Sequence, residues 1–150
     1  QLAAKSDQEW KVKWFVGNLA RLPLLDQSMD LLLDIFSPAN YQEFKRVLAP
    51  DGRLIKVIPT AAHLQEIRQK VKEHLDQADY SNEQIIQHFS DHFTIDNTIH
   101  CQETFELTPA LREALLSMTP LLFHVDPAQI DWTDLTQVTI SATILIGRSN

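Results

Sequence analysis

The sequence predicts one α/β domain built on an open sheet that is mostly parallel and ends in an antiparallel pair of strands. Two observations carry this prediction: apolar, strand-like runs alternate with an amphipathic helix in the first half, and a Thr- and Ile-rich run closes the chain. Strands that alternate with helices are joined by right-handed crossovers and run parallel. The 150 residues, 44% of them hydrophobic, suffice for one core, and no linker or internal repeat divides the chain.

The first half contains three strand-like runs and one clear helix. Residues 11–16 mix alternation with aromatic and β-branched side chains, which predicts a strand. Residues 31–36 form a short apolar run, typical of a strand buried on both faces of a parallel sheet. Residues 39–48 carry the apolar stripe of an amphipathic helix. Residues 53–58, after a Pro-Asp-Gly turn, predict the next strand.

The second half predicts three helices and two β segments. Residues 61–79 are polar with one apolar stripe, as in a surface helix. Ser81 opens a capping-box pattern ahead of a short helix. Residues 93–107 predict a β segment, and the Thr-Pro pair at the start of residues 108–118 predicts a helix. Residues 138–146 predict the closing strand.

The composition excludes several classes of site. Average usage would give roughly ten glycines in a chain of this length, but there are three, so no Gly-rich phosphate loop can be assembled. The single cysteine, Cys101, excludes an internal disulfide and a paired-cysteine zinc site. No run of 18 apolar residues occurs. We therefore expect a soluble protein of the reducing cytoplasm.

Charge is distributed unevenly along the chain, whose net charge is −7. Residues 1–72 carry 11 basic and 8 acidic side chains, whereas residues 73–150 carry 2 and 12. The mildly basic half could face a phosphate backbone, and the alternative is a solvated surface with an acidic second half.

Three segments succeed one another in a recognisable order. Residues 17–24 read Gly-Asn-Leu-Ala-Arg-Leu-Pro-Leu, residues 28–38 read Ser-Met-Asp-Leu-Leu-Leu-Asp-Ile-Phe-Ser-Pro, and residues 46–52 read Arg-Val-Leu-Ala-Pro-Asp-Gly. This succession resembles the later half of a class I S-adenosylmethionine-dependent methyltransferase. That family has an Asn or Asp after its third strand, a Leu-Pro turn, a Ser-hydrophobic-Asp entry into its fourth strand, and a helix that ends in Arg-Val-Leu-Lys-Pro-Gly-Gly.

Finer details resemble the 23S rRNA guanine-N1 methyltransferases within that class. They are Ile-Phe-Ser-Pro at residues 35–38, Pro59 followed by His-Leu-Gln-Glu-Ile at residues 63–67, and Met-Thr-Pro at residues 118–120. The resemblance implies a Rossmann-like sheet, S-adenosyl-L-methionine as cofactor, and methyl transfer to a guanine nitrogen of 23S rRNA.

The resemblance also implies that residues 1–150 are the C-terminal portion of a single methyltransferase domain whose N-terminal strands are missing. The Gly-rich cofactor loop, the acidic residue that ends the second strand and the zinc module of the rRNA enzymes have no counterpart here. We therefore expect a fragment that is inactive alone. An uncovered sheet surface predicts self-association into a homo-oligomer.

The resemblance places the cofactor beyond the carboxyl ends of the strands, where open α/β sheets bind ligands. It implies that Asn18, Leu19 and Ala20 contact the adenine, with Asn18 accepting from the exocyclic amine and Leu19 offering its backbone N–H. Asp34, near the end of an apolar strand, is expected near the methionine amino group or the target base. The alternatives are a turn-forming Asn18 and an Asp34 carboxylate that reaches solvent.

Four residues are candidates for binding the substrate. Phe36 could stack on a flipped-out guanine, the carbonyls around Ser37 and Pro38 could fix the edge of the base, and His63 could act as a base or contact a phosphate. The alternatives are a core Phe36 and a surface His63. Because methyl transfer is an in-line attack on a sulfonium, positioning is the main task of the protein, and no catalytic residue is assigned.

No metal site is expected, because nothing fixes a ligand geometry for the histidines at 88, 92 and 100. Two further functions stay open. The acidic second half is compatible with a methyltransferase that acts on a small molecule, and a domain without the glycine loop could be a non-catalytic binding or scaffold module.

Overall fold

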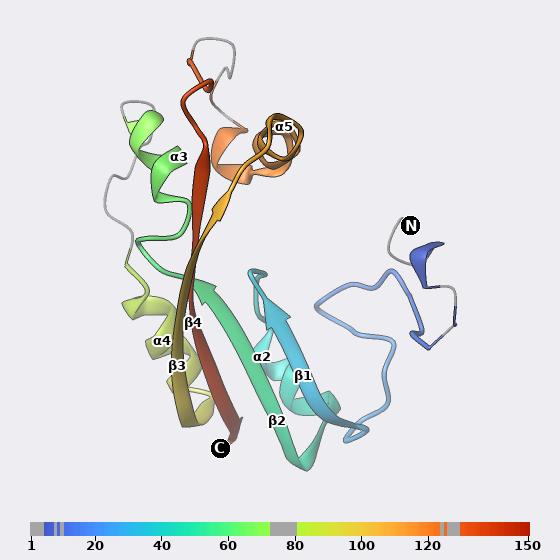
Figure 1. The fold of residues 1–150 in the computed structure, drawn as a ribbon. Coiled ribbons are helices and arrows are strands. Elements are labelled where there is room, and N and C mark those ends of the chain that lie inside the picture. Colours follow the sequence, from blue (N-terminus) through green and yellow to red (C-terminus); the bar gives the residue numbers. More distant parts are fainter. Residues whose placement is uncertain (1–4, 8, 10, 73–80, 124, 126–129) are drawn as a thin grey trace.

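The structure is a computed structural model that describes residues 5–7, 9, 11–72, 81–123, 125 and 130–150. These residues contain one four-stranded sheet in the order β1-β2-β4-β3 (Figure 1). The strands are β1 (Met29–Ile35), β2 (Leu48–Pro59), β3 (Phe93–Glu106) and β4 (Gln137–Ser149). The β1–β2 pair is parallel, whereas β4 runs antiparallel to both β2 and β3. The α/β class and the antiparallel closing pair are therefore confirmed. The sheet expected to be mostly parallel is instead mixed, with one parallel and two antiparallel pairings among the described strands.

Helices and a 3-10 turn accompany the sheet in the described part of the chain. The helices are α2 (Tyr41–Val47), α3 (Gln65–Lys70), α4 (Glu83–Ser90) and α5 (Pro109–Met118), and the 3-10 turn is η2 (Pro120–Leu122). Side-chain caps start two of them: Asn40 accepts from the Glu43 N–H, and Thr108 accepts from the Leu111 N–H. None of the helices that the structure describes has the length and apolar character needed to span a membrane.

The buried apolar residues form two clusters, each near a different end of the sheet. The main core joins α2 and α4 to one sheet face, and its fully buried members include Leu54 of β2, Phe89 of α4 and Leu145 of β4. The second cluster joins α3, η2 and the segment before β4, with Ile67 and Leu122 at its centre. Figure 1 shows α3 and α5 near one end of the sheet and α2 and α4 near the other.

The opposite face of β1 is uncovered in the described residues. Leu31, Leu33 and Ile35 alternate along this strand and are 50%, 62% and 55% exposed. They lie beside Arg53, Ile55 and Val57 of β2, their register partners. The outer edge of β1 has no strand beside it within the part of the chain described here. β1 therefore presents both an open edge and an apolar face, and the expectation that this strand is buried on both faces is wrong for the described residues.

The predicted strand at residues 11–16 is wrong. These residues form irregular chain with exposed side chains, among them Trp14 at 51% and Val16 fully exposed. Figure 1 shows the segment before β1 lying beyond the open edge of β1 and away from the sheet. Aromatic and β-branched residues favour a strand only where a neighbouring strand accepts the backbone hydrogen bonds. Among the described residues no strand takes that place.

The predicted helix boundaries also need correction. The helix expected over residues 61–79 corresponds to α3, which covers only residues 65–70. Residues 73–80 of that expected helix lie outside the described residues. The capping box expected at Ser81 is not formed, because Asn82 is the N-cap residue of α4. The Ser81 hydroxyl instead accepts from the Glu83 N–H at 3.2 Å.

Candidate functional site

Two cavities meet at the carboxyl ends of the parallel strands β1 and β2. The first, of about 570 Å³, lies against α4 and is called the α4 cavity; its lining includes Phe36, Ser37, Pro38, Tyr41, Lys56 and His88. The second, of about 550 Å³, lies against α5 and is called the α5 cavity; its lining includes Phe36, Pro59, His63, Arg68, Leu115 and Met118. Phe36 and Pro59 belong to both. The structure therefore brings all four predicted substrate residues to this one junction.

Phe36 is the first residue after β1 and has a left-handed backbone, with φ of 52°. A bulky side chain in that conformation costs on the order of 1–2 kcal/mol, so its surroundings must hold it there. Its N–H donates to the Val57 carbonyl at 3.0 Å. The ring is 48% exposed, so the alternative of a core phenylalanine is wrong. The ring centroid lies 5.0 Å from that of His63, with the planes tilted by 50°.

His63 is half-buried and held in one tautomer. Its Nδ1 accepts from the Ser141 N–H at 3.3 Å, which leaves the proton of the neutral ring on Nε2. Burial lowers the pKa of His63 below its ordinary value, and the nearby positive charge of Arg68 acts in the same direction. The ring beside Phe36 is therefore uncharged at neutral pH, which suits contact with an aromatic base better than contact with a phosphate.

A buried charged pair lies beneath Phe36. The Lys56 ammonium donates to Asp34 Oδ2 at 2.6 Å and to the Ser37 carbonyl at 3.0 Å. The Ser37 hydroxyl donates to the other oxygen of Asp34. Asp34 and Lys56 are each 4% exposed, so the alternative of a carboxylate that reaches solvent is wrong. Both oxygens of Asp34 are engaged by this chain, and a direct contact between Asp34 and the cofactor stays a prediction.

Tyr41 forms the wall of the α4 cavity next to this pair. Burial raises the pKa of Tyr41 to about 12, and the negative charge of Asp34 adds to the effect. The tyrosine ring packs edge-on against His88 and is stacked on His92, with centroid distances of 4.9 and 5.1 Å.

No group of three or more His, Cys, Asp or Glu in the described residues could hold a metal ion.

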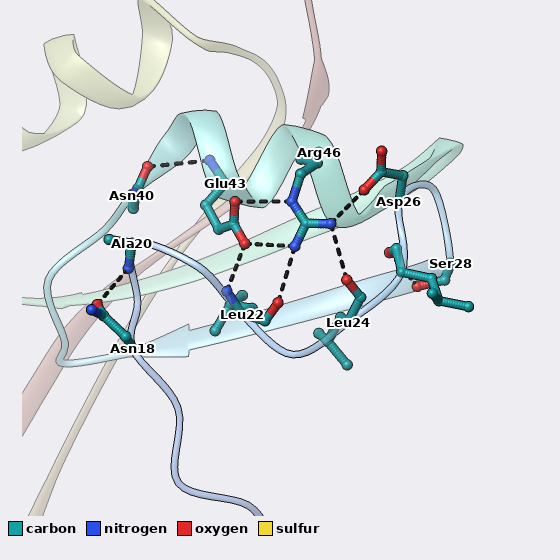
Figure 2. Close-up of polar contacts among 10 residues, drawn as sticks. Asn18, Ala20, Leu22, Leu24, Asp26, Ser28, Asn40, Glu43 and Arg46 are labelled. Atoms are coloured by element: carbon teal, nitrogen blue, oxygen red, sulfur yellow. Dashed lines mark hydrogen bonds and ion pairs between the residues drawn. The ribbon is translucent and has the colours of Figure 1, made fainter.

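The predicted adenine contacts lie in a turn that lines neither cavity. Figure 2 shows the side-chain oxygen of Asn18 accepting from the Ala20 N–H at 2.9 Å. The Asn18 carbonyl also accepts from the Arg21 N–H at 2.9 Å. Asn18 is thus turn-forming, the alternative that its residue type suggested. Leu19 packs against the main core, and its N–H has no hydrogen-bond partner among the described residues.

Helix α2 holds the loop that follows this turn (Figure 2). Glu43 accepts from the Leu22 N–H at 2.6 Å, and the Arg46 guanidinium donates to the Leu22 and Leu24 carbonyls at 3.1 and 3.0 Å. Arg46 also pairs with Asp26 at 2.5 Å. These contacts fix the path of the chain between the Asn18 turn and β1.

Sequence reasoning missed Lys56, Glu43 and Arg46. A signal existed for Lys56, because it is a charge flanked by apolar residues on both sides in its strand, as Asp34 is in the strand before it. The parallel register makes these two residues direct neighbours. Glu43 and Arg46 are spaced i,i+3 on a helix, a spacing that indicates an ion pair but not the loop that the pair holds.

Comparison with known proteins gives relatives by sequence and by fold. No family model matches the chain. A Bacillus subtilis (strain 168) protein named "Putative 23S rRNA (guanine-N(1)-)-methyltransferase YxjB" is 33% identical over 137 residues, which are 89% of this chain and 49% of that protein. The 23S rRNA (guanine(748)-N(1))-methyltransferase of Streptomyces fradiae is 26% identical over 85% of this chain and 47% of that enzyme. The chain thus spans about half the length of the curated relatives it matches.

Solved structures agree on the fold. A structure described as a putative methyltransferase, from Bacillus halodurans C-125, matches with a TM-score of 0.50 and 13% identity over 88% of this chain and 69% of that one. The PH0226 protein of Pyrococcus horikoshii OT3 matches with a TM-score of 0.52 and 14% identity over 99% of this chain and 64% of that one. The chain is therefore homologous to 23S rRNA (guanine-N1) methyltransferases, of which it spans about half the length. It has the fold of class I methyltransferases.

Proposed function

We propose that this chain supplies the guanine-binding part of an S-adenosyl-L-methionine-dependent methyltransferase that acts on 23S rRNA in the cytoplasm. The observation that carries the proposal is the exposed Phe36 ring, held in a left-handed backbone against the neutral His63 ring where two cavities meet. Strained residues of this kind concentrate at functional sites. The homologues named for methylation of guanine N1 support the choice of base.

In this proposal the target guanine leaves the RNA stack and enters the α5 cavity. The exposed Phe36 ring stacks on the base, the His63 ring lies against Phe36, and the apolar side chains of Leu115 and Met118 line the cavity beside them. The main-chain carbonyls around Ser37 and Pro38, which line the adjoining α4 cavity, meet the edge of the base where the two cavities join at Phe36. Methyl transfer breaks the carbon–sulfur bond of the sulfonium as the bond to guanine N1 forms, and the N1 proton is released to water. Rigid placement of the base in line with the methyl group is therefore the main contribution of this site.

The residues present fit the adenine end of the cofactor. The Leu19 N–H, held in the Asn18 turn and without a partner in the described residues, can donate to a ring nitrogen. The Asn18 side-chain oxygen already accepts from Ala20, so a contact with the exocyclic amine would share that oxygen. S-adenosyl-L-methionine supplies the methyl group as a sulfonium. The described residues contain no glycine-rich loop for its methionine end.

The test measures transfer of a radioactive methyl group from S-adenosyl-L-methionine to a 23S rRNA hairpin by the complete gene product that contains this chain. We expect F36A to lower kcat/KM for the RNA at least tenfold. The matched control is F105A, which truncates a phenylalanine of similar exposure, 45%, on β3 outside both cavities. Equal activity of F36A and the native protein would overturn the assignment of the base site.

A methyltransferase that acts on a small molecule is the second candidate, favoured by the acidic second half of the chain, with 12 acidic and 2 basic side chains. Acidic surfaces repel a phosphate backbone. The same gene product is then assayed with a metabolite pool and with the hairpin side by side. Methylation of a metabolite without methylation of the RNA would replace the first proposal with the second.

The uncovered face of β1 leads to a proposal about partners. We propose that Leu31, Leu33 and Ile35 mediate homo-oligomer formation by this chain in isolation, because they form an exposed apolar row along an open strand edge.

A further inference from the structure

Lys56 is a buried cation in the middle of an apolar strand, next to the proposed base site. Its side chain is 5% exposed and that of Asp34 is 3% exposed. Replacing such a buried pair by apolar residues of similar volume is often neutral or stabilising, so the pair is a weak source of stability. The role of the pair is therefore inferred from the groups that it contacts and not from its contribution to stability.

These contacts tie both ends of the segment that turns at Phe36. Asp34 is the register partner of Lys56 across β1 and β2, which places the two side chains next to each other near the end of β1. From there the ammonium reaches Asp34 before the turn and the Ser37 carbonyl after it. The Ser37 hydroxyl returns to Asp34 and completes a ring of hydrogen bonds around Phe36.

The ring of hydrogen bonds accounts for the left-handed backbone conformation of Phe36. A phenylalanine relaxes from φ of 52° unless the chain on both sides of it is fixed. Among the described residues, the main-chain bond to Val57 is the one hydrogen bond of Phe36 itself, so the neighbouring chain must carry the constraint. Lys56 contacts that chain on both sides, at Asp34 two residues before Phe36 and at Ser37 directly after it.

We propose that Lys56 is a positioning residue that acts through Asp34 and Ser37 to hold the Phe36 ring against His63, in the place where the target base stacks. Lys56 touches neither base nor cofactor in this role. The inference rests on the proposed function for its consequence in catalysis, whereas the effect on the placement of Phe36 is independent of it.

The decisive variant is the double replacement D34L/K56M, which exchanges the pair for apolar side chains and leaves no lone charge. We expect it to fold with a melting temperature close to that of the native chain. The nuclear Overhauser contact between the Phe36 and His63 rings is expected to weaken at least threefold in NMR spectra of this chain. K70M is the matched control, because Lys70 pairs with Asp134 away from both cavities.

The second measurement uses the complete gene product and the RNA hairpin. We expect D34L/K56M to lower kcat/KM for the RNA at least tenfold. In an F36A background the same double replacement is expected to cost less than twofold further, because the residue that it positions is already truncated. An equal loss in both backgrounds would overturn the inference.

The outcomes separate the positioning role of Lys56 from the assignment of the base site. An unchanged contact between Phe36 and His63 in D34L/K56M overturns the positioning role, whatever the activity. A weakened contact with full methylation of the RNA supports the positioning role and overturns the base site instead. If the double variant does not fold, S37A takes its place. Ser37 is exposed, and S37A removes only the hydroxyl bond to Asp34, so we expect a smaller weakening of the same ring contact.

Discussion

Glu43 and Arg46 lie one turn apart on α2 and pair at 2.6 Å, and through this pair the helix holds the loop that precedes β1. The Arg46 guanidinium, by hydrogen bonding and charge, lowers the pKa of Glu43 from 4.5 to about 2. The pair therefore makes the loop sensitive to acid.

Replacing Glu43 by Gln should flatten the dependence of stability on acid pH. A carboxylate with a lowered pKa in the folded state stabilises the protein above pH 4.5, and this contribution is lost as pH falls from about 4.5 toward about 2. Urea unfolding at several pH values measures the slope. E113Q, at an exposed position of α5, should keep the native slope. An E43Q slope as steep as the native one would contradict the assignment.

Replacing Arg46 by Lys should free the loop even though the charge is kept. A lysine cannot reproduce the planar fork that reaches Glu43 and the carbonyls of Leu22 and Leu24 together. We expect hydrogen exchange at the Leu22 amide to accelerate ~10-fold, the loss of about one charged hydrogen bond. K45A, on the same helix, serves as the control and should leave that amide protected. Native protection in R46K would show that the loop is held by other contacts.

His63 should make the protein less stable in mildly acidic solution. Its pKa is lowered in the folded state, so the unfolded chain binds the proton more readily and stability falls as pH drops below about 6.5. H63Q should lose this part of the pH dependence between pH 7 and 5. Thermal unfolding across that range measures it. H100Q, a change on β3 outside both cavities, is the control and should keep the native pH dependence of stability.

Two replacements of Phe36 should separate strain from function. F36G and F36A both remove the ring, but only glycine adopts φ of 52° without a steric penalty. F36G is expected to be about 1 kcal/mol more stable than F36A, and both should lose methyl transfer. Urea unfolding gives the difference. Equal stability of the two variants would mean that the turn relaxes once the ring is gone.

A charge on the open face of β1 should prevent self-association. Leu33 is 62% exposed, so L33D costs little burial and places a carboxylate in the centre of the apolar row. Sedimentation velocity at increasing concentration should show oligomers for the native chain and monomers for L33D. L111D, a similar change at a 56% exposed position of α5, should still associate. A monomeric native chain would overturn this proposal.

Local sequence patterns were sufficient for most of the elements. The apolar run at residues 31–36, the stripe at 39–48 and the Thr108-Pro109 start of a helix correspond to β1, α2 and α5. Each pattern depends on neighbours within a few residues, so it survives without knowledge of the rest of the chain. The strand predicted at residues 11–16 failed for the converse reason, because strand formation needs a partner from another part of a sheet.

The sequence by itself determined the class of fold and predicted the segment of the candidate site, since residues 34–38 and His63 lie at or after the ends of strands whose carboxyl ends bind ligands in such folds. Only the tertiary structure decided which groups hold these residues in place. The parallel register pairs Asp34 with Lys56, and the return of β4 beside β2 brings Ser141 to His63. Such contacts join residues 22 and 78 positions apart, and packing of the whole sheet, not local propensity, brings them together.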